Sequence, residues 1–140
     1  MSLRYLLDTN VLSEPVKPQP NPGVMRRLQA HRLESATGSP AWHELLYGCH
    51  RMQASRKRRL VEDYLYEALA PSLTILPYDA AAAEIHGRER ARLSGLGKSP
   101  AFIDGQLAAI ARAHDLVLVT RNTDDFRYFA DLALEDWHEP

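Results

Sequence analysis

The sequence predicts a single α/β domain, residues 1–140, with a parallel sheet that is covered by helices on both faces. The chain has 140 residues, of which 45% are hydrophobic, and such a length buries roughly two-thirds of the unfolded surface in one core. Short apolar runs alternate with amphipathic stretches, which is the pattern of strands joined by helical crossovers. The first apolar run stops on the polar sequence Asp8-Thr9-Asn10.

The first half of the chain begins with a strand, because residues 4–7 are apolar, too few for a helix and followed by turn-forming residues. Residues 13–22 hold four prolines and are expected to form an extended loop. A short helix is expected over residues 23–32 and a brief second strand over residues 35–38. Ser39-Pro40 is a typical helix start. The elements expected next are a helix toward Met52, a second amphipathic helix that ends at Pro71, and a strand over residues 73–76.

The second half of the chain continues the alternation. Asp79 is the expected N-cap of an alanine-rich helix that runs toward Leu93. Ser99-Pro100 repeats the cap-and-proline start, and apolar residues at helical spacing follow it. Residues 116–119 form the most strand-like run, and residues 133–135 are expected to add a short edge strand.

Three acids fall at positions that a parallel sheet brings together. Asp8 follows the first strand, Glu44 lies early in the helix after Ser39, and Asp104 is expected in the second turn of its helix. Helix starts favour anions, which accounts for each helical acid singly. Jointly, the three converge on the sheet edge where ligands bind in open α/β folds.

Such a carboxylate cluster needs a cation, because two carboxylates about 4 Å apart repel by roughly 4 kcal/mol at an effective dielectric constant near 20. Oxygen ligands suit hard ions, and Mg²⁺ binds one or two carboxylates while it keeps waters and accepts phosphate oxygens. A phosphodiester is the natural substrate, because the ion offsets phosphate charge and activates water. A carboxylate outside the coordination shell would hold or deprotonate that water.

The composition of the chain bears on its binding partners and its cellular location. The formal net charge is -1, so no global field attracts nucleic acid. Cys49 is the only cysteine, as in proteins of a reducing cytosol. Asp8 interrupts the first apolar stretch, unlike a signal peptide, and no stretch approaches the ~20 apolar residues of a membrane span. We therefore expect a cytoplasmic protein without membrane contact.

Four ordered blocks of the sequence resemble the PIN-domain ribonucleases, and among them the VapC-type toxins with their FitB-like branch. The blocks are LDTNVLSE from Leu7, WHELLYG from Trp42, IDGQLAAIA from Ile103, and VTRN from Val119 with Asp125-Phe126. Together they span nearly the whole chain and are far more specific than an isolated Asp-Thr-Asn.

The resemblance implies a doubly wound, mainly parallel sheet of about five strands and an endoribonuclease that depends on Mg²⁺ or Mn²⁺. It also implies a toxin of a type II toxin–antitoxin system: a homodimer, blocked by a cognate VapB-type antitoxin and linked to operator DNA only through that antitoxin. Asp8, Asp104 and Glu44 carry over as metal ligands, with Glu44 bound directly or through water. Many members have an acid where this chain has Asn122, so Asn122, Asp124 and Asp125 all remain candidates for the fourth catalytic position.

Three other patterns carry less weight. His43, Cys49 and His50 lack the spacing and number of zinc ligands, and Gly97-Lys98-Ser99 follows a helix, unlike a phosphate-binding loop. The basic run 56–59 reads as a solvated face or an RNA contact. The alternative function is a catalytically weak PIN-fold binding module that acts with an antitoxin in a DNA-bound regulatory complex. Asn122, an amide that cannot act as a base, supports that alternative.

Overall fold

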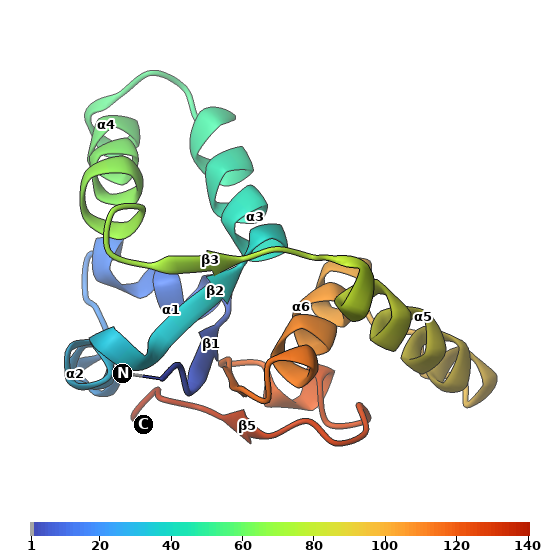
Figure 1. Ribbon diagram of the computed structural model, residues 1–140. Coiled ribbons are helices and arrows are strands. Elements are labelled where there is room, and N and C mark those ends of the chain that lie inside the picture. The colour runs from blue at the N-terminus through green and yellow to red at the C-terminus, as the bar shows by residue number, and fades with distance from the viewer. Residues whose placement is uncertain (1) are drawn as a thin grey trace.

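The sheet has five parallel strands in the order β3-β2-β1-β4-β5, with the first strand of the chain at its centre (Figure 1). The computed structural model describes residues 2–140. The strands are β1 (Tyr5–Leu7), β2 (Ser35–Gly38), β3 (Thr74–Leu76), β4 (Val117–Val119) and β5 (Leu134–Glu135). The chain adds strands on one side of β1 and then on the other, so the order reverses between β1 and β4. The predicted fold class is therefore confirmed.

Different helices cover the two faces of the sheet. Leu6 and Leu118 point into a core shared with α5 and α6, whereas Leu7 and Val119 point into a second core shared with α1 and α2. This alternation is the period of two that a strand imposes on its side chains. The α-helices are α1 (Thr9–Leu12), α2 (Pro22–Ala30), α3 (Ser39–His50), α4 (Arg56–Asp63), α5 (Ala80–Gly95) and α6 (Phe102–Ala113).

Four further helical segments connect these elements. Three are 3-10 turns and one is a π-helix that continues α4; they are η1 (Glu14–Val16), η2 (Arg32–Glu34), η3 (Tyr64–Leu69, the π-helix) and η4 (Thr123–Asp125). The expected helix that ends at Pro71 is thus α4 followed by η3. In Figure 1, α3 and α4 form a hairpin on one side of the sheet, and α5 and α6 lie on the other.

The two Ser-Pro pairs behave differently from the prediction. Ser39 is the first residue of α3 and not its cap, and its hydroxyl accepts a hydrogen bond from the backbone N–H of Tyr78 at 3.2 Å. Ser99 lies outside α6, and its Oγ is 3.3 Å from Ser94 Oγ. Since α6 starts only at Phe102, the predicted start at Ser99 is wrong, and Asp104 lies in the first turn of the helix instead of the second.

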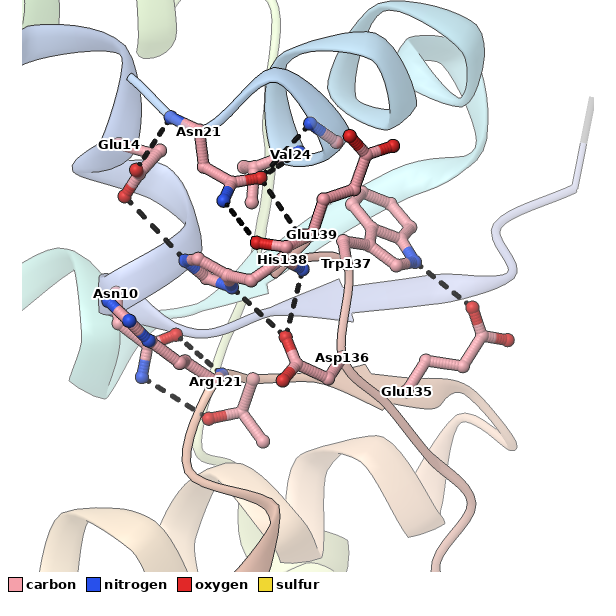
Figure 2. A network of polar contacts seen from close by, with 12 residues as sticks. Asn10, Glu14, Asn21, Val24, Arg121, Glu135, Asp136, Trp137, His138 and Glu139 are labelled. Atoms are coloured by element: carbon pink, nitrogen blue, oxygen red, sulfur yellow. Dashed lines mark hydrogen bonds and ion pairs between the residues drawn. The ribbon is translucent and has the colours of Figure 1, made fainter. Parts of the chain in front are cut away.

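The C-terminal segment closes the second core against the start of the chain. Trp137 is buried beside the ring of Tyr5, with 5.1 Å between ring centres. His138, next to it, has its Nε2 3.6 Å from the buried carboxylate of Glu14, and Asn21 binds the backbone of Glu139 (Figure 2). Residues near both ends of the chain therefore stabilise the same side of the sheet.

No helix within residues 2–140 is long and apolar enough to cross a lipid bilayer.

Candidate active site

Asp8 lies at the carboxyl end of the central strand, where the strand order reverses. The chain turns into α1 directly after β1, and the Asp8 side chain caps that helix by accepting the Thr9 N–H at 2.7 Å. Only 5% of Asp8 is exposed. Its second oxygen accepts a hydrogen bond from the Thr120 hydroxyl at 2.9 Å. Asp8 is therefore held in one orientation by groups from β1, α1 and the end of β4.

Asn10 and Thr120 connect the ends of the two strands. Asn10 Oδ1 accepts the backbone N–H of Arg121 at 3.0 Å (Figure 2), and its Nδ2 lies 3.3 Å from Asp8 Oδ2 and 3.2 Å from Thr120 Oγ1. Thr120 is fully buried, and its hydroxyl also accepts the N–H of Asn122 at 3.1 Å. Buried polar groups in such a network fix one another because each would be costly to leave unpaired.

Asp104 and Glu44 face the same edge from two different helices. Burial raises the pKa of Asp104 to about 6, and the negative charges of Asp8, Asp125 and Glu44 add to this shift. Burial also raises the pKa of Glu44, together with the charge of Asp8, while His43 acts in the opposite direction. The structure thus brings Asp8, Glu44 and Asp104 within electrostatic reach of one another, as the sequence suggested.

The three candidates for the fourth catalytic position follow β4 and differ in their surroundings. Asn122 is exposed, and its backbone N–H donates to Thr120. Asp125, three residues later at the end of η4, acts directly on the pKa of Asp104. Asp124 is also exposed, and its carboxylate lies 3.7 Å from Arg127. Asp125 is therefore the residue after β4 that adds negative charge to the Asp104 site.

The donor set fits a hard divalent ion that retains part of its water shell. The available ligand atoms are carboxylate oxygens, and burial together with the charges of nearby acids disfavours the ionised form of Asp104, which a bound cation would stabilise. Within residues 2–140, no group of three or more His, Cys, Asp or Glu side chains is arranged so that it could hold a metal ion on its own. An ion bound through one or two carboxylates needs no such group, since waters complete its coordination.

Sequence reasoning missed the roles of Asn10 and Thr120. Both lie in the motifs that frame the acids, but their hydrogen bonds to Asp8 depend on the register of β1 against β4, in which Leu7 faces Val119. The available signal was that Thr120 immediately follows a predicted strand. His43 and His50 contribute to no zinc cluster in the part of the chain described, where His50 pairs with the hydroxyl of Tyr66.

The acidic edge at the strand-order reversal of a five-stranded parallel sheet defines a protein of the PIN-domain class. The PIN-domain family profile matches residues 5–132, so the chain belongs to the PIN-domain family.

Individual relatives match over almost their whole length. The chain is 36% identical to toxin FitB of Neisseria gonorrhoeae, over 96% of this chain and 99% of the relative. It is 32% identical to the tRNA(fMet)-specific endonuclease VapC of Shigella flexneri, over 96% and 98%. The solved structure of FitAB bound to the IR36 DNA fragment superposes with a TM-score of 0.88 at 31% identity, and the alignment covers 97% of each chain.

Proposed function

We propose that this chain is an endoribonuclease, the toxin of a toxin–antitoxin pair, and that it uses Mg²⁺ or Mn²⁺ held at Asp8, Glu44 and Asp104. The observation that carries the proposal is the gathering of these acids at one edge of the sheet, where burial and then the charges of neighbouring acids raise the pKa of Asp104 to about 6. Structural ion pairs lower carboxylate pKa values, whereas crowded acids with raised values are typical of functional sites. The nuclease names of the relatives agree with this chemistry.

Each residue has a distinct task in the proposed site. When bound, the ion would offset charge on the scissile phosphate and lower the pKa of water. Asp8 and Asp104 would supply ligand oxygens. The hydrogen bonds to Oδ1 and Oδ2 of Asp8 keep its carboxylate in place. Glu44 is more exposed and has a raised pKa, so it is suited to orient a water molecule and accept its proton. Asn122 and Asp125 would complete the edge, with Asp125 adding negative charge near Asp104.

The proposed partners follow from the relatives. FitAB and VapBC structures contain a toxin with a second protein, and several include DNA. We propose that this chain likewise acts in the cytoplasm as a homodimer, is inhibited by a VapB-type antitoxin, and contacts operator DNA only through that antitoxin. Light scattering of the purified protein, alone and coexpressed with the product of a neighbouring reading frame, tests the assembly.

The catalytic proposal is tested with Asp8→Asn. We expect the parent protein to cleave cellular RNA in Mg²⁺ or Mn²⁺ but not in chelator, and Asp8→Asn to lose at least about 100-fold in rate because an amide is a poor ligand for a hard ion. Circular dichroism and thermal unfolding show whether the variant is folded. Asp63→Asn, on the exposed end of α4, is the matched control.

The same experiment distinguishes the alternative function. A protein that binds an antitoxin and its DNA but shows no metal-dependent cleavage above the Asp8→Asn background would be a PIN-fold binding module. Cleavage that persists undiminished in folded Asp8→Asn would contradict the assignment of Asp8 as a metal ligand.

A further inference from the structure

Two cations gather around one exposed aromatic ring beside the acidic edge. Lys98 comes from the loop after α5, and Arg127 and Tyr128 follow η4. Arg127 Nη2 donates to Tyr128 Oη at 2.9 Å, and Lys98 Nζ lies 3.5 Å from the same oxygen. The Lys98 ammonium is 4.5 Å and the Arg127 guanidinium 4.9 Å from the ring centre. We call Lys98, Arg127 and Tyr128 the basic cluster.

The positive charge of the basic cluster is poorly neutralised. Within residues 2–140, no carboxylate lies within 4 Å of Lys98 Nζ, and Arg127 has only Asp124, at 3.7 Å. The Asp124 side chain is 89% exposed, and ion pairs so exposed are weak. An anion that bound both cations and the Tyr128 hydroxyl would relieve their mutual repulsion through charge-assisted hydrogen bonds.

A surface cavity beside the basic cluster extends to Asp125. The cavity has a volume of about 240 Å³, and its walls include Lys98, Tyr128, Asp124 and Asp125. Asp125 is the residue whose charge acts on Asp104. A ligand in this cavity would therefore contact Lys98 and Tyr128 of the basic cluster and also Asp125, the neighbour of the acidic edge.

A second cavity adjoins the first at the loop between α5 and α6. It has a volume of about 200 Å³, shares Ser99, Pro100 and Phe129 with the first, and is lined by Arg90 and Phe102. The Arg90 guanidinium is 5.1 Å from the centre of the Phe102 ring, which is 51% exposed. Alternating cations and exposed aromatic rings are the elements of single-stranded nucleic-acid binding surfaces.

We propose that the basic cluster binds a backbone phosphate of single-stranded RNA, next to the nucleotide at the carboxylates, and that the strand continues toward Arg90 and Phe102. This inference rests on the proposed nuclease function and names the residues that position its substrate. RNA accounts for the surface better than an acidic protein segment does, because cations alternate with exposed aromatic rings on which bases can stack. Lys98 and Arg127 would act on one phosphate, with Tyr128 contributing a hydroxyl donor.

The test separates RNA binding from RNA cleavage. A labelled oligouridine of about 10 nucleotides is titrated with the protein in chelator, and fluorescence anisotropy is followed over a range of salt concentrations. We expect Lys98→Ala combined with Arg127→Ala to weaken binding about 10-fold or more and to lower the salt slope by about 1, since one phosphate contact is lost. Arg88→Ala, an exposed cation on α5 paired with Glu84, is the matched control and should leave binding unchanged.

A second measurement covers the cleavage reaction. In Mg²⁺ or Mn²⁺, the double variant should raise KM for a short RNA by a larger factor than it lowers kcat, because the cluster acts on binding. Tyr128→Phe, which keeps the ring and removes the hydroxyl, should give a smaller loss of affinity than the double variant. Circular dichroism and thermal unfolding show that each variant is folded.

The outcomes distinguish the inference from the proposed function. RNA affinity and KM that are unchanged in the folded double variant, with cleavage intact, would overturn the inference and leave the nuclease proposal standing. Loss of RNA affinity in the double variant of a protein that never cleaves would support the RNA contact and overturn the nuclease proposal. If the double variant instead loses only self-association or antitoxin binding, the cluster is a protein interface and the inference is wrong.

Discussion

Asp104 is held where its negative charge is unfavourable. Its folded-state pKa of about 6 exceeds the ordinary value of 3.8, because the carboxyl is half-buried and lies near Asp8, Asp125 and Glu44. Between these two values the folded chain binds more protons than the unfolded chain. The free energy of unfolding therefore falls as pH rises through this window, and the loss is complete above the folded-state pKa. Without metal, the ionised site destabilises the fold.

The cost of this half-buried negative charge predicts that Asp104→Asn stabilises the metal-free protein while it abolishes cleavage. In chelator at about pH 8 we expect Tm to rise by about 2–5 °C, and the gain to shrink as pH falls toward about 4, where the parent carboxyl is protonated. Differential scanning fluorimetry across pH measures the effect. Asp63→Asn should show no such pH-dependent gain. A lower Tm for Asp104→Asn at pH 8 would contradict the electrostatic account.

The Thr120 hydroxyl fixes the orientation of Asp8. Thr120→Val preserves shape but removes a hydroxyl that donates to Asp8 and accepts from Asn122. We expect a 10- to 100-fold loss in metal affinity or cleavage, the usual effect of removing a group that orients a ligand, and a loss of about 1–3 kcal/mol in stability. Mn²⁺ titration and urea unfolding measure the two effects.

The conservative variant gives the contrast for Thr120. Thr120→Ser keeps the hydroxyl and should restore most of the metal affinity. If Thr120→Val and Thr120→Ser bound Mn²⁺ equally well, the hydroxyl would have no part in positioning Asp8.

The helix that carries Asp104 is placed by close packing against α5. A Cβ atom at Gly105 would overlap the ring of His86, with Cδ2 only 2.8 Å away. The His86 ring is itself fixed, because its Nδ1 lies 2.8 Å from the Tyr78 hydroxyl and the ring is buried. Gly105 therefore sets the distance between α5 and α6. It directly follows Asp104, the proposed metal ligand.

A pair of glycine variants tests this packing. Gly105→Ala should destabilise the fold by about 1–3 kcal/mol, because α6 must shift to admit the methyl group. Gly87→Ala, in α5 with open space around it, should stabilise by roughly 0.5–1 kcal/mol through its better helix propensity. Urea unfolding measures both. Equal effects of the two substitutions would show that the packing at Gly105 is looser than the contact distances indicate.

Sequence patterns predicted the elements well where the signal was local. Asp79 caps α5 by accepting the Ala82 N–H at 3.0 Å, as expected, and all five strand candidates are strands. The start of α6 was predicted wrongly because a Ser-Pro pair satisfies the local rules at Ser99 as well as at Ser39. Only tertiary contacts distinguish the two pairs: Ser39 binds the backbone of Tyr78, whereas Ser99 faces Ser94.

The acids of the site could be predicted from the sequence, but the residues that hold Asp8 in place could not. Asp8 follows a recognisable strand, and strand ends in parallel sheets meet at one edge, so its position was accessible from sequence. The roles of Asn10 and Thr120 depend on which strand pairs with β1 and in what register. Those pairings span more than 100 residues, and no local pattern encodes them.

Across the whole molecule, the C-terminal segment is part of the core and not an appendage. Trp137 is 1% exposed and lies among Tyr5, His31 and Val24. We expect Trp137→Ala to cost about 3–5 kcal/mol, a large part of the 5–15 kcal/mol typical of a domain. Urea unfolding followed by circular dichroism measures this loss. Leu33→Ala, at a position 63% exposed, should stay within about 0.5 kcal/mol. Similar losses in both variants would contradict this packing.

The central position of β1 has a consequence for synthesis on the ribosome. Asp8 leaves the exit tunnel early, but the Thr120 hydroxyl that holds it lies 112 residues further along the chain, and translation adds only about 5–20 residues per second. The carboxyl edge therefore cannot be completed until nearly all of the polypeptide has been made. A nascent or prematurely terminated chain that lacks β4 would be inert. The proposed nuclease activity would therefore arise in the cell only after synthesis of the chain is nearly complete.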